Sequence, residues 1–323
     1  MLLVLVALFV PATPSAEAHQ ARRLYRIGVL EIVDAAANGP NLGAFRERLA
    51  ELGYVEGHDV LIEYRSADGR SERLPDLATE LVRLKVDVIV ARGTRAALSA
   101  QAATLTIPIV MASSGDPVSE GIVASLARPG GNITGFHVMA PPELGGRRLR
   151  LLKEVVPASS RVGVISNSAD ILSPLIVRET EKVARVLGVQ LKHLDVQRPE
   201  AFEPAFEAAL MDQVDALIAV EDSLTFADRT KIVGFAAMSR LPAVYGLREY
   251  VEAGGLMSYG TDRRDLFRRS ATYVHRILRG ARPSELPIEA PVKFELALNL
   301  KTAETLGLTI PPSLLSRADY VVR

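Results

Sequence analysis

A pattern that occurs twice restricts the fold most: a short β-branched run, then a polar loop, then an amphipathic helix. In the first half, YRIGVL at 25–30, VLIEY at 60–64 and VDVIV at 86–90 indicate strands. In the second half, RVGVIS at 161–166 and VDALIAV at 214–220 repeat the pattern. Strands that alternate with helices favour parallel sheets covered by helices. The sequence therefore predicts an α/β protein with two doubly wound parallel-sheet lobes joined by a multi-strand hinge.

The stretch 106–135, TIPIVMASSGDPVSEGIVASLARPGGNITG, ends the first series. Its apolar run indicates a buried strand, with Pro108 at the entrance. Asp116 and Pro117 then suit the N-cap and the first position of a helix. A helix N-terminus at the carboxyl edge of an open α/β sheet favours anionic ligands. A plain strand-to-helix connection is the alternative.

Composition excludes several classes of function. The 323 residues suffice for two domains, and Lys plus Arg equals Asp plus Glu at 38 each, so no nucleic-acid partner is expected. The chain has no cysteine, which excludes disulfides and thiol catalysis. The five histidines are scattered, and no HExxH, phosphate-binding loop or G-x-S-x-G motif occurs. We therefore expect no enzyme activity, no metal and no cofactor.

The N-terminal residues indicate export. LLVLVALFV at 2–10 is continuously apolar, and the small residues that follow include an A-x-A pattern at 16–18. The run is too short to span a bilayer. A core helix is the alternative, and no Lys or Arg precedes the run. We expect 1–18 to be a signal peptide and the mature protein to be periplasmic.

Domain boundaries follow from the two series and from GGLMSYG at 254–260, which indicates a strand that crosses back. The expected first lobe comprises 24–136 plus 258–282, and the expected second lobe comprises 137–257 plus 283–323. Several crossings of this kind would form a hinge that permits closure around a ligand.

Longer stretches resemble a known family. They recur at similar spacing over nearly the whole chain after the leader: ELGYVEGHDVLIEYR, ELVRLKVDVIVARGT, the stretch 106–135, EAGGLMSYG and NLKTAETLGLTIPPSLLSRAD. The chain resembles the substrate-binding components of ABC transporters, in the family of tryptophan/phenylalanine-type periplasmic binding proteins. The resemblance implies a type I periplasmic-binding-protein fold, a small-molecule ligand between the lobes, and delivery to an ABC permease in the inner membrane. A monomer is expected.

The resemblance and the strand exits together suggest ligand contacts in the first lobe. Thr94, Ser113, Ser114 and Asp116 follow strands there. Hydroxyls and amide N–H groups suit a carboxylate, although Asp116 could instead cap its helix. Arg95 stands where relatives commonly have a proline. It could clamp an anionic ligand or point to solvent.

The second lobe offers Asn167 and Asp222, also at strand exits. A carboxamide and a carboxylate suit an α-ammonium group through hydrogen bonding and charge pairing. Surface solvation is the alternative for each. Relatives commonly have Asn-Pro where this chain has Asn167-Ser168, a departure that bears on the ligand. Tyr245 could form an apolar wall or lie in the core.

The predicted function is that of a periplasmic solute-binding component of an ABC importer, which closes on an amino acid or related carboxylate. One alternative is a ligand-sensing module that acts through a membrane receptor, because the same fold serves both. An α/β enzyme is a weaker alternative, since it needs a nucleophile or a metal constellation.

Overall fold

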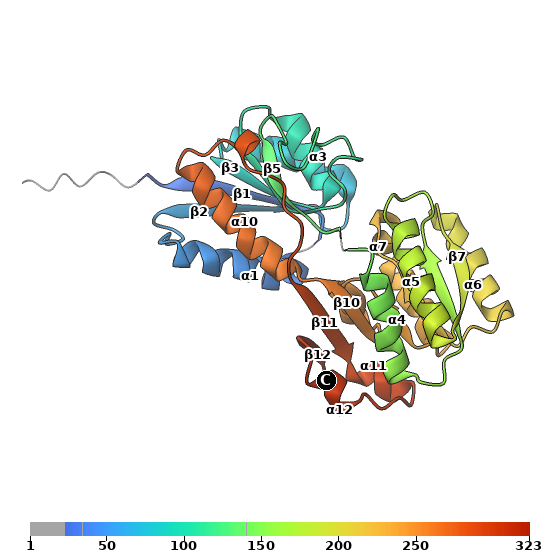
Figure 1. Ribbon diagram of the computed structural model, residues 1–323. Helices are drawn as coiled ribbons and strands as arrows, with labels where there is room; N and C mark the ends of the chain where they lie inside the picture. The colour runs from blue at the N-terminus through green and yellow to red at the C-terminus, as the bar shows by residue number, and fades with distance from the viewer. Residues whose placement is uncertain (1–22, 34, 140) are drawn as a thin grey trace, which may run out of the picture.

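The computed structural model describes residues 23–33, 35–139 and 141–323. These residues form two α/β lobes (Figure 1). The first sheet has the strand order β2-β1-β3-β4-β5, and the second has the order β12-β11-β10-β9-β8-β6-β7. The strands pair in parallel except β10 with β11. The predicted α/β class is confirmed, while the predicted signal peptide lies outside the described residues.

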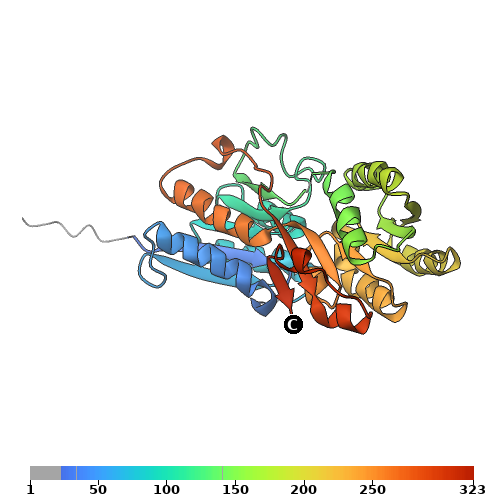
Figure 2. The same cartoon turned by 60° about the horizontal axis from the view of Figure 1, so that its bottom comes forward.

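In the first lobe, alternate residues of each strand serve opposite layers. Val88 and Val90 pack toward α1 and α10, whereas Ile89 and Ala91 pack toward α2 and α3. Figure 2 shows α1 and α10 side by side. The elements are β1 (Tyr25–Glu31), α1 (Ala35–Glu51), β2 (Val60–Ser66), α2 (Leu74–Arg83), β3 (Val88–Arg92), α3 (Thr94–Ala103), β4 (Ile109–Ser114), β5 (Ile133–His137) and α10 (Arg263–Leu278).

The helix expected after Asp116 does not form. The described chain makes turns from 116 to 127 and returns as β5, a strand that we did not predict. Asp116 does act as a cap, since its Oδ1 accepts hydrogen bonds from the N–H groups of Val118 and Ser119. Gly121, at φ +69°, then leaves the helical region. The predicted cap at Asp116 is therefore present, but no helix follows it.

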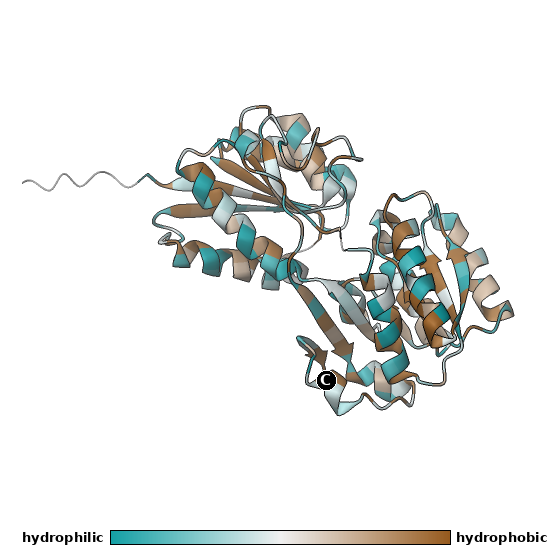
Figure 3. Cartoon of the chain, in the orientation of Figure 1, coloured by the Kyte–Doolittle hydropathy of each residue, from teal (hydrophilic) through white to brown (hydrophobic). Residues whose placement is uncertain are grey.

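The second lobe repeats the layering. Ile218 belongs to the core under α4 and α5, whereas Leu217 and Ala219 face α6 and α8. Figure 3 shows apolar strands beneath helices with hydrophilic outer faces. The elements are α4 (Leu144–Val155), β6 (Arg161–Ser166), α5 (Ser173–Leu187), β7 (Gln190–Asp195), α6 (Phe202–Met211), β8 (Ala216–Ala219), α7 (Ser223–Ala227), α8 (Arg229–Met238), β9 (Ala243–Tyr245), α9 (Arg248–Glu252), β10 (Met257–Thr261), β11 (Phe294–Asn299), α11 (Leu300–Thr305), α12 (Pro312–Leu315) and β12 (Tyr320–Val322).

The chain crosses between the lobes three times: between β5 and α4, between β10 and α10, and at 290–293 before β11. β10 lies wholly in the second sheet, between β9 and β11, so the expected boundary at 258 cuts through a strand. Glu289 forms a bridge with Phe136 of β5, so the chain before 290 runs beside the first sheet. The expected boundaries at 258 and 283 therefore need correction, because each crossing follows the end of a strand or an edge pairing.

None of the described helices has the length and hydropathy needed to cross a membrane.

Candidate functional site

The first group of candidate residues lies at the carboxyl ends of β3 and β4. Thr94 is the first residue of α3, and its Oγ1 accepts a hydrogen bond of 2.9 Å from the N–H of Gly115. The N–H of Gly93 donates to the carbonyl of Ser113 at 2.6 Å. Ser113 and Ser114 end β4 and are buried. The structure thus brings Thr94, Ser113 and Ser114 together, as neighbouring parallel strands require.

Two hydroxyl groups of this set, those of Thr94 and Ser113, donate no hydrogen bond to a described residue. Among the described residues, no acceptor pairs with the hydroxyl of Thr94, and no side-chain hydrogen bond involves Ser113. Ser114 Oγ approaches the carbonyl of Gly115 at 3.4 Å, which is a long contact for a hydroxyl donor. The hydroxyl hydrogens of Thr94 and Ser113 are therefore not committed to a described acceptor.

Arg95 and Asp116 are engaged within the first lobe. Arg95 is exposed, and its Nη1 donates to Ser71 Oγ at 2.8 Å. Asp116 caps the turn after β4. The contacts of Asp116 are those of a capping residue, and the exposed Arg95 contacts a side chain of its own lobe.

The second group joins the carboxyl ends of β6 and β8. Asn167 Nδ2 donates to Asp222 Oδ2 at 2.6 Å. Asp222 caps α7: its Oδ1 accepts from the N–H of Thr225 at 2.6 Å, while Thr225 Oγ1 accepts from the N–H of Asp222. Asp222 is partly exposed. A fixed, partly exposed carboxylate is suited to a cationic group.

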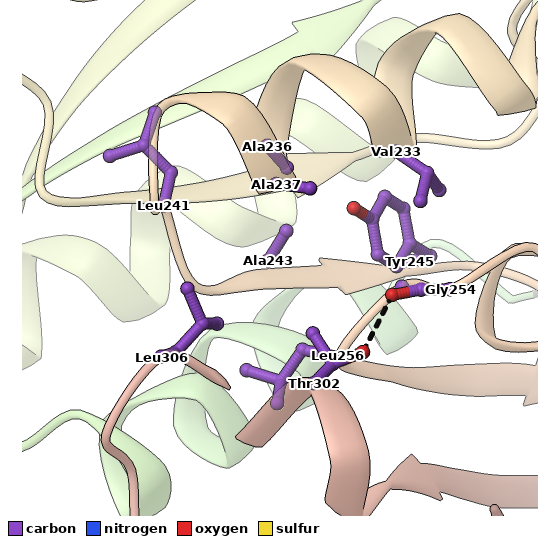
Figure 4. A pocket seen from close by; sticks show the side chains of 11 residues that line it. Val233, Ala236, Ala237, Leu241, Ala243, Tyr245, Gly254, Leu256, Thr302 and Leu306 are labelled. Carbon is purple, nitrogen blue, oxygen red and sulfur yellow. Dashed lines mark hydrogen bonds between the residues drawn. The ribbon is translucent and has the colours of Figure 1, made fainter. Parts of the chain in front are cut away.

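The assignment of Tyr245 to a ligand wall needs correction. Its side chain is 1% exposed and stacks on Tyr250, with ring centroids 4.8 Å apart. It points toward α8 and lines a small apolar recess in the core of the second lobe, beside Val233 and Gly254 (Figure 4). Burial raises the pKa of its phenol. The parity of the three-residue strand β9 directs Tyr245 into the core.

Sequence reasoning missed a buried ion cluster between the lobes. We call Glu31, Arg92, Glu249 and Arg263 the interlobe cluster. Arg92 contacts Glu31 Oε2 at 3.3 Å and Glu249 Oε1 at 3.1 Å, and Arg263 also contacts Glu249 Oε1. Arg92 ends β3 and Glu249 lies in α9, just after β9, so the carboxyl edges of the two sheets face each other here. Arg92 was recognisable as a charge at a strand exit, but its partner in α9 was not.

Glu249 gives this cluster an acid-sensitive member. Burial raises the pKa of its carboxyl group, but Arg263 and Arg92 outweigh burial and hold that pKa at about 2, below the usual 4.5. A carboxyl group whose pKa is lower in the folded state stabilises the fold at higher pH. The contribution of Glu249 is therefore complete above pH 4.5 and is lost as the pH falls toward 2.

The lowered pKa of Glu249 gives the unfolding free energy a testable pH dependence. Between pH 4.5 and 2 we expect the unfolding free energy of Glu249→Gln to fall less steeply with decreasing pH than that of the wild type. The slopes should differ by up to about 1.4 kcal/mol per pH unit, the limit for one proton. Urea unfolding followed by circular dichroism at several pH values measures both slopes. Equal slopes would contradict the ion pairing of Glu249.

Within the described ranges, no group of three or more His, Cys, Asp or Glu side chains is placed to hold a metal ion. His137, at the end of β5, is buried, and its Nδ1 has no hydrogen-bond partner among the described residues. Burial lowers the pKa of its imidazole, while Asp116 acts in the opposite direction.

Comparisons with known proteins agree with the predicted resemblance. The family described as ABC transporter substrate binding protein matches residues 26–322. The tyrosine-binding protein of Clostridioides difficile strain R20291 is 24% identical over 288 residues, which cover 89% of this chain and 82% of that protein. The structure of an ABC domain in complex with L-Trp from Streptococcus pneumoniae is 27% identical, with a TM-score of 0.74, over 93% of this chain and 100% of that one.

A conserved domain protein from Vibrio cholerae is 28% identical, with a TM-score of 0.73, over 92% of this chain and 99% of that one. These likenesses extend over both lobes and match the type I periplasmic-binding-protein fold. The chain therefore belongs to the family of ABC transporter substrate binding proteins.

Proposed function

We propose that this protein is the periplasmic solute-binding component of an ABC importer and that it closes on an amino acid through its α-carboxylate and α-ammonium groups. The observation that carries the proposal is complementary chemistry on two facing sheet edges. The first lobe offers hydroxyl donors at Thr94 and Ser113, and the second offers the carboxylate of Asp222. The contact of Arg92 with Glu249 supports the view that these edges face each other.

The polar groups of the two edges complement the charges of an amino acid as well as their positions. Hydroxyl donors in the first lobe stabilise a carboxylate, since hydrogen bonds to charged groups are the stronger ones. In the second lobe, Asp222 Oδ1 lies against the N–H and the hydroxyl of Thr225, whereas Oδ2 accepts one hydrogen bond, from Asn167, and retains capacity for a further donor. An α-ammonium group supplies three such donors.

Two relatives support this class of ligand. The Streptococcus pneumoniae structure contains L-Trp, and the Clostridioides difficile relative is described as tyrosine-binding. Both ligands carry the α-carboxylate and α-ammonium groups that the two edges would recognise. The family and the apolar N-terminal run support the proposed permease partner and periplasmic location.

Isothermal titration calorimetry against the common L-amino acids tests the proposal. We expect at least one to bind. Its deaminated analogue, which lacks the cation, and its decarboxylated analogue, which lacks the anion, should each bind at least about tenfold more weakly, as expected for a lost charged hydrogen bond. Failure of the whole panel with folded protein would contradict the proposal. So would equal binding of an amino acid and its deaminated analogue.

A further inference from the structure

The imidazole of His137 is a buried polar group that makes no hydrogen bond within the described part of the chain. His137 is the last residue of β5 and is 5% exposed. Its Nδ1 is buried and has no hydrogen-bond partner among the described residues. Nearly all buried polar side-chain atoms of folded proteins are paired, so an unpaired one needs a reason. The ring therefore keeps its capacity to bind a group from outside the chain.

The alternation of side chains along β5 directs His137 toward α3. Ile133 belongs to the core beneath α2 and α3, whereas Phe136 packs toward α1 and α10. Residues an even number of positions apart on a strand share one face of the sheet. His137 therefore lies on the same face as Ile133, at the carboxyl end of the strand.

His137 is joined to the N-terminus of α3 through the end of β4. Ser114 is its register partner, and the N–H of Val138 donates to the carbonyl of Ser114 at 2.8 Å. The next residue of β4's exit, Gly115, donates its N–H to Thr94 Oγ1 at 2.9 Å. Thr94 begins α3, a helix of ten residues, and a helix N-terminus stabilises negative charge. The imidazole, the two hydroxyls and the helix N-terminus thus occupy one end of the candidate site.

Charged groups on the elements around His137 are mostly engaged elsewhere. The carbonyl of Glu289 accepts a hydrogen bond of 3.2 Å from the N–H of His137. The carboxylate of Glu289 instead contacts Arg269 and Tyr273 of α10. On α3, Arg95 is exposed and donates to a hydroxyl group on the surface of the first lobe. These groups leave the imidazole without an ionic partner of its own among the described residues.

Burial and Asp116 act on the imidazole in opposite directions. Burial lowers the pKa of His137 below its usual 6.5 and outweighs Asp116, which raises that pKa. At neutral pH the ring is therefore largely uncharged. A carboxylate beside it would stabilise the imidazolium form and raise the pKa of the ring. Ligand binding and pH are then linked through this one proton.

We propose that His137 completes the carboxylate end of the site, donating a hydrogen bond to the ligand's α-carboxylate beside Thr94 and taking up a proton from solvent as the ligand binds. The inference rests on the proposed function, because it concerns the carboxylate of that ligand. Ligand affinity then rises as the pH falls through the higher pKa of the bound form, and it levels off below the lower pKa of the free form. One proton limits this rise to about tenfold per pH unit.

A nuclear magnetic resonance titration tests the contact with a carboxylate alone. The pKa of each histidine ring is measured in sodium acetate and in sodium chloride of equal ionic strength, and His137→Gln assigns the signal. Acetate should raise the pKa of His137 by about 1, the lower end of the range for a neighbouring opposite charge. His58 and His193 are exposed and serve as internal controls, since their pKa values should agree in the two salts.

Calorimetry with the amino acid identified by the panel measures the proton uptake. Near pH 6.5, the usual pKa of histidine, the binding enthalpy should differ between PIPES and Bis-Tris buffers, whose ionisation enthalpies differ. His137→Gln cannot take up the proton, so this difference should disappear and binding should weaken about tenfold. The matched control is His193→Gln, which changes a histidine paired with Glu181 on the surface of the second lobe and should behave as the wild type.

The two measurements separate this inference from the proposed function. If no amino acid binds but acetate raises the pKa of His137, the proposed function fails and the carboxylate contact stands. If an amino acid binds while neither it nor acetate changes that pKa, the inference is wrong and the proposed function stands. Proton uptake that persists unchanged in His137→Gln would also overturn the inference. If acetate has no effect and no amino acid binds, both are wrong.

Discussion

Replacement of Arg148 by methionine is expected to lower the unfolding free energy by about 3–5 kcal/mol, the typical cost of removing one partner of a buried ion pair. Arg148 is fully buried in α4, and its two terminal nitrogens contact Glu221 at 2.5 and 2.6 Å. Its Nε donates to the carbonyl of Tyr259 at 2.8 Å. Methionine fills much of the volume but leaves Glu221, 12% exposed, as an uncompensated charge. Urea unfolding with an unchanged m-value measures the loss.

Two comparisons separate the lost charge pairing from the lost packing. Arg147→Met changes the neighbouring residue, which contacts Tyr259 Oη at the surface, and should cost at most about 0.5 kcal/mol. The double variant Arg148→Met/Glu221→Leu should recover most of the loss, since an apolar pair of similar volume can replace a buried ion pair. If Arg148→Met costs no more than Arg147→Met, the ion pair does not stabilise the second lobe as described.

Local patterns predicted the fold because both lobes are built from strand–helix units that each show their own periodicity. The same reasoning failed where local and tertiary preferences differ. Asp116 carries a helix-capping signal and does cap a turn, but the chain then leaves the helical region at Gly121. β5 was missed because ITGFH at 133–137 is short and contains Gly135. That glycine has φ +129°, and a Cβ there would lie 2.2 Å from the carbonyl oxygen of Met111.

Candidate site residues were predictable only as far as topology brings strand ends together. The pairing of Asn167 with Asp222 follows from neighbouring parallel strands, so residues 55 positions apart could be expected in one group. Tyr245 was misplaced because the side-chain parity of a three-residue strand is not visible in the sequence. The Arg92–Glu249 pair depends on how two lobes meet, which no local pattern encodes.

Replacement of Asp222 by asparagine is expected to weaken amino-acid binding by about 10- to 100-fold. A hydrogen bond to a charged group contributes about 1.5–3 kcal/mol, and each 1.4 kcal/mol is about tenfold in affinity. Asparagine caps helices about as well as aspartate, so α7 should persist and the unfolding free energy should change little. The variant therefore removes the negative charge while keeping the capping geometry of Asp222 toward Thr225.

The control for this prediction flanks the same strand, β8, at its other end. Asp215 precedes β8 at its amino end and accepts hydrogen bonds from the N–H groups of Ser160 and Arg161. Asp215→Asn makes the same chemical change at the opposite edge of the sheet, so it should leave the affinity within about twofold, the effect expected of a position that does not contact ligand. Calorimetry with the amino acid identified by the panel, and with its deaminated analogue, measures both variants. Asp222→Asn should weaken binding of the amino acid but not of the analogue, because only the amino acid carries the cation. Equal weakening of both ligands would mean that Asp222 supports the shape of the site and does not bind the α-ammonium group.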